Sequence, residues 1–166
     1  LTHFISGERR SIAFTKSRKL TEILTKTVHE LLDNLNLSQL KTQVRSYRSG
    51  YMPADRRRIE AELRDGSISA IVATSALELG IDIGDLEASV HMGFPGSISS
   101  LRQQIGRAGR TIQNEPSAAV LILNDAPMDQ HYAKHPNQLF ESAPEGIVID
   151  PSNQVLLRRH LRCAVS

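Results

Sequence analysis

Several common classes of protein are excluded by what the chain lacks. Cys163 is the only cysteine in 166 residues, so we expect no internal disulfide and a reducing compartment, the cytoplasm or the nucleus. No apolar run approaches the roughly 20 residues that cross a bilayer, so we expect no membrane contact. Tryptophan is absent and aromatic residues make up 4% of the chain, which argues against an aromatic platform for stacking bases.

Two further absences concern the ends of the chain and its phosphate chemistry. The chain begins with Leu1 rather than methionine and has no signal-peptide pattern, so we expect it to be a piece of a longer protein. It has no Gly-x-x-x-x-Gly-Lys-Ser/Thr loop and no Asp-Glu pair for magnesium. His131 and His135 lie four residues apart but lack further ligands, so we predict no metal site.

The charge that is present is unevenly distributed. The net charge is +2, yet residues 1–64 carry 13 Lys and Arg against 7 Asp and Glu. Residues 65–166 carry 7 against 11. A basic first half favours a phosphate-bearing partner, although an ordinary solvated surface is the alternative.

Apolar patterning predicts alternating strands and helices. Short apolar runs predict strands, and apolar spacings of three and four predict helices. The alternation predicts an α/β fold, a parallel sheet with helices on both faces, followed by a short, mostly helical extension. The predicted strands are Ser11–Thr15, Val44–Tyr47, Ala70–Ala73, Ala88–Met92 and Ala118–Leu123. The predicted helices are 17–35, 53–66, one from Ser97 or Ser99 to Arg107, and one from about Asn153.

Polar clusters follow three of these strands. They are Thr15-Lys16-Ser17-Arg18, Arg48-Ser49-Gly50 and Thr74-Ser75. Ligands of parallel sheets gather at the carboxyl ends of the strands. The clusters therefore predict a rim of hydroxyls, amides and cations that binds a phosphodiester backbone without reading bases.

The stretch from Gln103 to Arg110 reads QQIGRAGR. On a continuous helix, Gln103, Arg107 and Arg110 share one face, because their spacings are four and three. This face would carry two guanidinium groups and one amide, and the glycines beside them have no side chains that would block a ligand. Such a surface suits nucleotide phosphates, because guanidinium groups match phosphate oxygens. A solvated basic helix and glycines that lie near the end of a helix are the alternatives.

Four blocks, in this order and spacing, resemble the second RecA-like domain of superfamily-two helicases. They are Ile12–Arg18, Tyr47–Tyr51 with Arg56 and Arg57, Ala73–Ile83, and Gln103–Arg110. Segments of the last 40 residues, such as Pro127–Tyr132 and His160–Ala164, resemble the YprA-type, RecQ-related repair helicases. The resemblance implies a RecA-like domain at residues 1–123 and an extension at 124–166.

The resemblance also implies a nucleotide role for five residues. Arg107 and Arg110 are expected as arginine fingers on ATP, which with Mg²⁺ is held mainly by an absent first RecA-like domain. Gln103, Asp82 and Gly80 are expected near the same nucleotide. Asp82 as a plain turn residue is the alternative.

Four more residues are expected to bind the nucleic-acid backbone. They are Thr74, Thr15, Ser17 and Arg48. Thr74 as a helix cap and Arg48 as an ordinary surface arginine are the alternatives. The family implies 3′-to-5′ unwinding of DNA in repair. An RNA helicase, or a non-enzymatic docking module with a degenerate helicase fold, stays open.

Two features outside these motifs receive structural interpretations. Asp125 and Asp129 are interpreted as charges at the start of a helix. Cys163 lies in an apolar and basic helical pattern, which predicts a packed thiol.

Overall fold

The computed structural model describes residues 1–81, 83, 86–109, 117–146, 150 and 152–164. All five predicted strands are confirmed, each to within one residue. In chain order, the elements are α1 (Thr2–Ser6), β1 (Ser11–Phe14), α2 (Arg18–Asn34), η1 (Ser38–Gln43), β2 (Val44–Tyr47), α3 (Pro53–Arg64), β3 (Ala70–Ala73), η2 (Ser75–Leu77), β4 (Ala88–Met92), α4 (Ile98–Ile105), β5 (Ala118–Ile122), α5 (Pro127–Lys134), α6 (Gln138–Glu141) and α7 (Gln154–Ala164).

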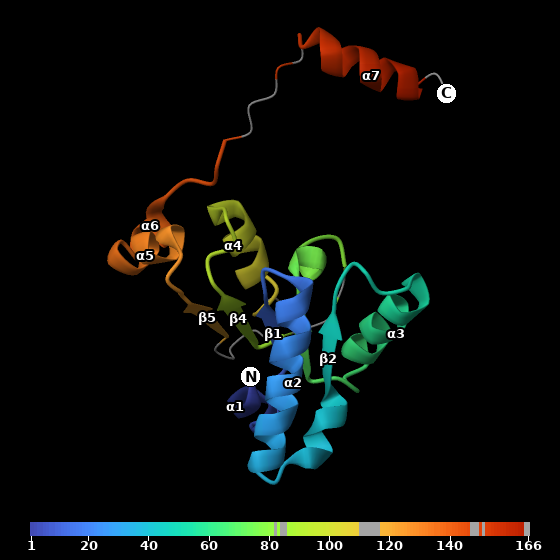
Figure 1. Cartoon of the computed structure of the whole chain (residues 1–166), viewed down its shortest axis with the longest axis vertical. Coiled ribbons are helices and arrows are strands. Elements are labelled where there is room, and N and C mark those ends of the chain that lie inside the picture. The colour runs from blue at the N-terminus through green and yellow to red at the C-terminus, as the bar shows by residue number, and fades with distance from the viewer. Residues whose placement is uncertain (82, 84–85, 110–116, 147–149, 151, 165–166) are drawn as a thin grey trace.

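The strands form one parallel sheet in the order β2-β3-β1-β4-β5 (Figure 1). Phe14 of β1 lies opposite Ala73 of β3 and His91 of β4. Tyr47 of β2 also lies opposite Ala73. The carboxyl ends of these four strands are therefore nearly level, and the loops that follow them share one edge of the sheet.

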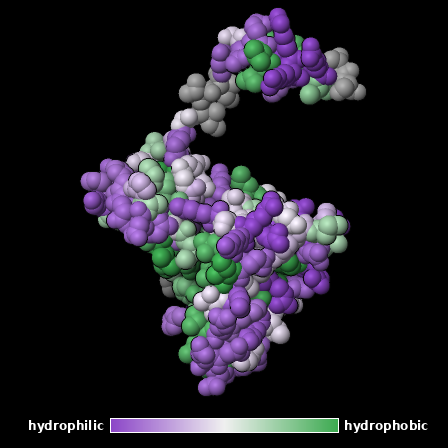
Figure 2. Space-filling view, viewed as in Figure 1, coloured by the Kyte–Doolittle hydropathy of each residue, from purple (hydrophilic) through white to green (hydrophobic). Residues whose placement is uncertain are grey.

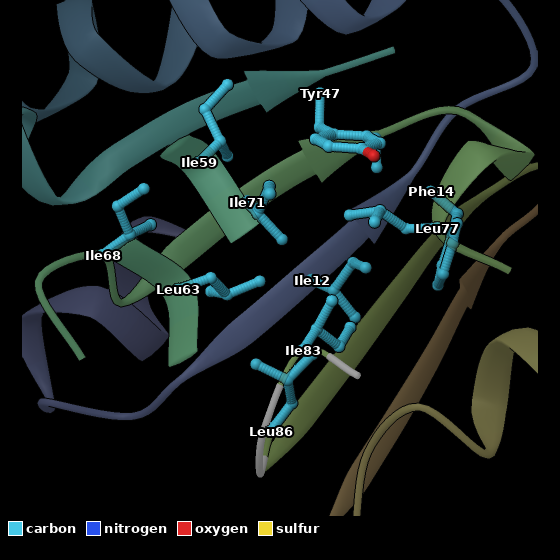
Figure 3. Close-up of a cluster of buried hydrophobic side chains, with 11 residues drawn as sticks. Ile12, Phe14, Tyr47, Ile59, Leu63, Ile68, Ile71, Leu77, Ile83 and Leu86 are labelled. Atoms are coloured by element: carbon cyan, nitrogen blue, oxygen red, sulfur yellow. The ribbon is translucent and has the colours of Figure 1, made fainter. Parts of the chain in front are cut away.

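Helices cover both faces of the sheet, as predicted. On one face, Ile59 and Leu63 of α3 join side chains of β1 and β3 in an apolar cluster (Figure 3). On the other face, Val28 and Leu32 of α2 pack with Ile5 of α1. Because both faces are covered, β1 and β3 are buried at every position, which explains their continuous apolar sequences.

The buried side of α2 differs from the predicted apolar stripe. Thr21 and Thr25 are buried toward the sheet, whereas Leu31 and Leu35 are 44% and 56% exposed. The threonines fit there because their hydroxyls are satisfied inside the helix, as when Thr25 Oγ1 donates to the Thr21 carbonyl at 2.9 Å. Short side chains with satisfied hydroxyls thus occupy two of the buried positions of α2.

The first part of the extension packs on the sheet domain. Tyr132 of α5 and Leu139 of α6 contact an apolar cluster that contains Phe94 and Leu101. The Glu145 carboxylate accepts hydrogen bonds from the backbone N–H groups of the first two α4 residues, at 2.6 and 3.1 Å. The division between residues 123 and 124 stays a prediction, but these contacts join the two parts.

The last helix, α7, stands away from the sheet (Figure 1), and no residue of it is buried. Its apolar side chains, among them Leu156 and Leu161, reach solvent. Figure 2 shows hydrophobic and hydrophilic residues side by side on this helix. The prediction of a packed Cys163 is wrong for this structure, because the residue is exposed. A pattern that predicts a buried helix face gives no information on what covers that face.

Two neighbouring leucines of α2 give a matched test of the core. Leu32 is fully buried, whereas Leu31 is 44% exposed. Leu32→Ala is expected to lower the free energy of unfolding by about 2–5 kcal/mol, because it leaves a cavity against the sheet. Leu31→Ala is expected to cost less than about 1 kcal/mol. Urea unfolding measures both values, and equal losses would contradict this assignment of the core.

Candidate functional site

A cavity of about 250 Å³ opens at the edge of the sheet where the segments after β1, β3 and β4 meet. Lys16 follows β1, Ser75 follows β3 and Gly93 follows β4, and all three line the cavity together with Gln104 of α4. The order β3-β1-β4 makes these strands neighbours, so their following residues surround one space. The register places the ends of β1, β2 and β3 at one edge, as predicted, but the predicted cluster after β2, Arg48-Ser49-Gly50, does not line this cavity.

The hydroxyl groups predicted at this edge are engaged in local bonds. Thr15 is buried, and its hydroxyl lies 2.7 Å from the Thr21 hydroxyl. Ser17 caps α2 by accepting a hydrogen bond from Leu20 N–H at 3.1 Å. Thr74 caps η2 in the same way. A phosphate contact by the Thr15 hydroxyl requires these internal bonds to break, whereas Ser17 lies on the surface.

Arg48 lies at the same edge but is paired with an acid. Its Nε donates to Glu22 Oε1 at 2.9 Å, and its guanidinium stacks on Tyr51, 4.6 Å from the ring centre. Burial raises the pKa of Glu22, but the hydrogen bonds from Arg48, Tyr51 and Ser46 outweigh it, so the pKa lies below its ordinary value. Arg48 is therefore half of an ion pair with Glu22 before any ligand binds.

A partly buried polar network ties α4 to the loop after β3. Gln104 Nε2 donates to Glu78 Oε2 at 2.9 Å, and Ser100 Oγ donates to the same oxygen at 2.7 Å. Gln104 Oε1 lies 3.1 Å from His91 Nδ1, and His91 Nε2 lies 3.0 Å from Ser89 Oγ. The network therefore runs from the core of β4 through the helix to the loop.

Arg107 holds that loop by its backbone. Its Nε and Nη2 donate to the Glu78 carbonyl at 2.9 and 2.6 Å, and its Nη1 donates to the Ile81 carbonyl at 2.6 Å. The side chain is buried, with the residue 5% exposed. The predicted helix is present as α4, but it ends at Ile105 with Gly106 as its cap, two residues before the predicted end at Arg107. Arg107 and Gln103 therefore do not share a helix face.

The other predicted nucleotide residues lie beside this loop or outside the described part. Gly80 is exposed and has φ of +75°, in the left-handed region that favours glycine. Gln103 is half-buried on α4. Asp82 and Arg110 lie outside the described residues. Within the described ranges, no group of His, Cys, Asp or Glu side chains could hold a metal ion. The same ranges contain no helix that is long and apolar enough to cross a membrane.

Sequence analysis missed several polar residues of the site. Gln104 occupies a buried position of α4, three residues after Leu101, and this apolar spacing was the signal that could have identified it. The interpretation of Asp129 as a helix-start charge was incomplete. It does lie in the first turn of α5, but its side chain is fully buried and accepts hydrogen bonds from Phe94 N–H and Asn124 N–H, each at 3.0 Å.

The buried His91 predicts a loss of stability in acid. Burial lowers the pKa of His91 below its ordinary value of 6.5, and the Gln104 hydrogen bond offsets this only in part. As pH falls below 6.5, the unfolded chain binds a proton there that the folded chain does not. The free energy of unfolding should therefore fall by up to about 1.4 kcal/mol per pH unit until the folded pKa is reached.

Urea unfolding between pH 7.5 and 5 measures this dependence, and His91→Gln should make it shallower. An equally steep dependence in the variant would assign it to other groups.

The fold and the sequence both match known helicases. Residues 1–112 match the family described as the helicase conserved C-terminal domain. The chain is 44% identical to the ATP-dependent helicase hrq1 of Schizosaccharomyces pombe and 41% identical to the ATP-dependent helicase YprA of Bacillus subtilis, over 99% and 97% of its residues. It matches a crystal structure of the DUF1998 helicase MrfA bound to DNA and AMPPNP with a TM-score of 0.87 and 40% identity over 98% of its residues.

The matched regions are a small part of these relatives. The chain covers 15% of hrq1, 21% of YprA and 22% of the MrfA chain. The parallel sheet with helices on both faces is thus the RecA-like fold of the helicases it matches. By sequence, topology and fold, the chain belongs to the helicase conserved C-terminal domain family.

Proposed function

We propose that the chain is the second motor domain of an ATP-dependent DNA helicase, working with a first RecA-like domain in a longer protein. One observation supports this most directly. The loop that begins with Thr74 and Ser75 at the strand-edge cavity is held, four residues further on, by Arg107 of the QQIGRAGR motif. A single short loop thus connects the phosphate-binding edge with the predicted nucleotide side.

At the strand edge, the proposed ligand is the backbone of a single DNA strand. Thr74, Ser17 and Arg48 bind its phosphates, and Thr15 supports them from inside the edge. Phosphate binding at this edge needs no base contacts, in keeping with movement along any sequence. The similarity to MrfA, whose structure contains DNA, favours DNA over RNA. We include 3′-to-5′ unwinding in DNA repair in this proposal, since the family resemblance implies it.

On the other side of the loop, Gln103, Asp82 and Gly80 contact ATP that the first domain holds with Mg²⁺. Arg107 and Arg110 neutralise charge on its phosphates during hydrolysis. The chemistry of the donors fits, because guanidinium groups match phosphate oxygens. For Arg107 this role requires an exchange. Its guanidinium must leave the carbonyls of Glu78 and Ile81 when the two domains close, and the loop is then free to move.

Arg107→Ala tests the nucleotide role. In the full-length helicase, strand-stimulated ATP hydrolysis should fall by about 10³–10⁵-fold, the range for loss of an arginine finger, while strand affinity changes little. Steady-state hydrolysis and fluorescence anisotropy measure the two. Arg58→Ala, on the exposed side of α3 and paired with Asp55 at the surface, should keep the activity. Undiminished hydrolysis in a folded Arg107→Ala protein would refute the finger role.

A competition between strands tests the nucleic acid. The full-length protein should hydrolyse ATP faster with single-stranded DNA than with RNA of the same sequence. Stronger stimulation by RNA would instead favour an RNA helicase. A non-enzymatic docking module predicts tight strand binding by this chain alone, whereas a motor domain predicts weak binding that falls with salt.

A further inference from the structure

A buried carboxylate of the extension lies directly behind the strand-edge cavity. Asp129 is 0% exposed. Its oxygens accept hydrogen bonds from the backbone N–H groups of Phe94, after β4, and Asn124, after β5. Asp129 lies beyond residues 1–112, the part of the chain that matches the helicase conserved C-terminal domain, in a region that the helicase relatives also align with. The extension therefore places a negative charge under the loops of the motor fold.

The cation that faces this carboxylate is Lys16. Lys16 Nζ lies 3.4 Å from Asp129 Oδ1, and the lysine side chain is 44% exposed while the aspartate is fully buried. Lys16 also lines the cavity. An ammonium group has three donors, and the pair with Asp129 uses one. The ion pair with Asp129 thus restrains the Lys16 side chain, part of which stays exposed to solvent.

Gly93 makes this arrangement possible. A Cβ atom at position 93 would lie 2.8 Å from Lys16 Nζ and 2.9 Å from Asp129 Oδ2, closer than real Cβ atoms come. Gly93 also has φ of +84°, which other residues rarely adopt. The lysine, the carboxylate and the bare backbone therefore form one packed unit at the edge of the cavity.

The energetics favour a positioning role for this unit. A buried carboxylate is costly unless it is hydrogen-bonded and paired, and two amides and one ammonium provide this. A free lysine side chain loses rotamer entropy when it is ordered. Asp129 orders Lys16 before any ligand arrives. The rim cation Arg48, by contrast, is held by an acid that is itself 48% exposed.

We propose that Lys16 binds a backbone phosphate of the nucleic acid at this cavity and that Asp129 is the positioning residue that holds it there. The inference rests on the proposed function and adds to it that the extension is part of the strand-binding site. The competing interpretation is that Lys16 only neutralises Asp129 and never meets the strand. The two interpretations differ in how mutations of the pair combine.

The experiment uses the full-length helicase and a fluorescent single-stranded DNA. Lys16→Met should weaken binding about fivefold to tenfold and make the slope of log affinity against log salt shallower by about 0.7, the value for one phosphate on a single strand. Lys16→Arg should restore most of the affinity. Lys26→Met is the control for lost charge, since Lys26 lies on the exposed side of α2, paired with Glu30.

Asp129→Asn tests the positioning role. It should raise the concentration of DNA for half-maximal hydrolysis several-fold and leave the rate at saturating DNA within about twofold. In the Lys16→Met background the same change should have no further effect on DNA affinity. Thermal unfolding identifies a variant that fails to fold, and in that case the Lys16→Met and Lys16→Arg results decide.

Two results would overturn the proposal. If Lys16→Met binds DNA as the wild type does, the ion pair has only a structural role. If Asp129→Asn weakens binding equally with and without Lys16, the carboxylate does not act through the lysine. Either result leaves the motor function intact, because the wild type still binds DNA. A wild-type protein that binds no strand would instead overturn the proposed function, and this inference with it.

Discussion

Parallel pairing of β3, β1 and β4 is the constraint on which the site depends. Parallel neighbours with level ends deliver their following residues to one place, even when those residues are far apart in the chain. Lys16, Ser75 and Gly93 meet at the cavity for this reason alone. A shift of one strand by one residue would turn its buried side chains to the opposite face and would also break this edge. The apolar packing on both faces, which fixes the register, therefore fixes the site.

Below that edge, hydrogen bonds between polar groups fix how the loop and the helix lie relative to each other. Hydrogen bonds depend on direction, whereas apolar contacts do not. The Glu78 carboxylate accepts hydrogen bonds from the side chains of Gln104 and Ser100, and its backbone carbonyl accepts hydrogen bonds from Arg107. Such bonds are strong in a low-dielectric interior and costly to leave unmade. The loop after β3 is thus held at a defined position relative to α4. These few hydrogen bonds would therefore transmit a movement of α4 to the strand edge.

The sequence predicts the fold closely and the site in part, for a physical reason. Strands β1 and β3 are covered on both faces, so burial leaves a continuous apolar run that can be recognised without a structure. Arg107 bonds to backbone carbonyls, and a carbonyl has no residue type that would reveal it. Lys16 and Asp129 are 113 positions apart. Nothing local relates the two, so only the folded chain brings them together.

Glu145 has a consequence for where free anions can settle. The exposed N–H groups at the start of a helix form a binding site for phosphate or sulfate. At α4 this site is already occupied by the carboxylate of Glu145 from the same chain. Hydrogen bonds from Ile98 and then from other backbone N–H groups lower the pKa of Glu145, so the carboxylate stays charged in mild acid. The Glu145 carboxylate thus competes with free anions for the N-terminus of α4. Truncation of the chain before Glu145 would leave the N–H groups of Ile98 and Ser99 available to an anion from solution.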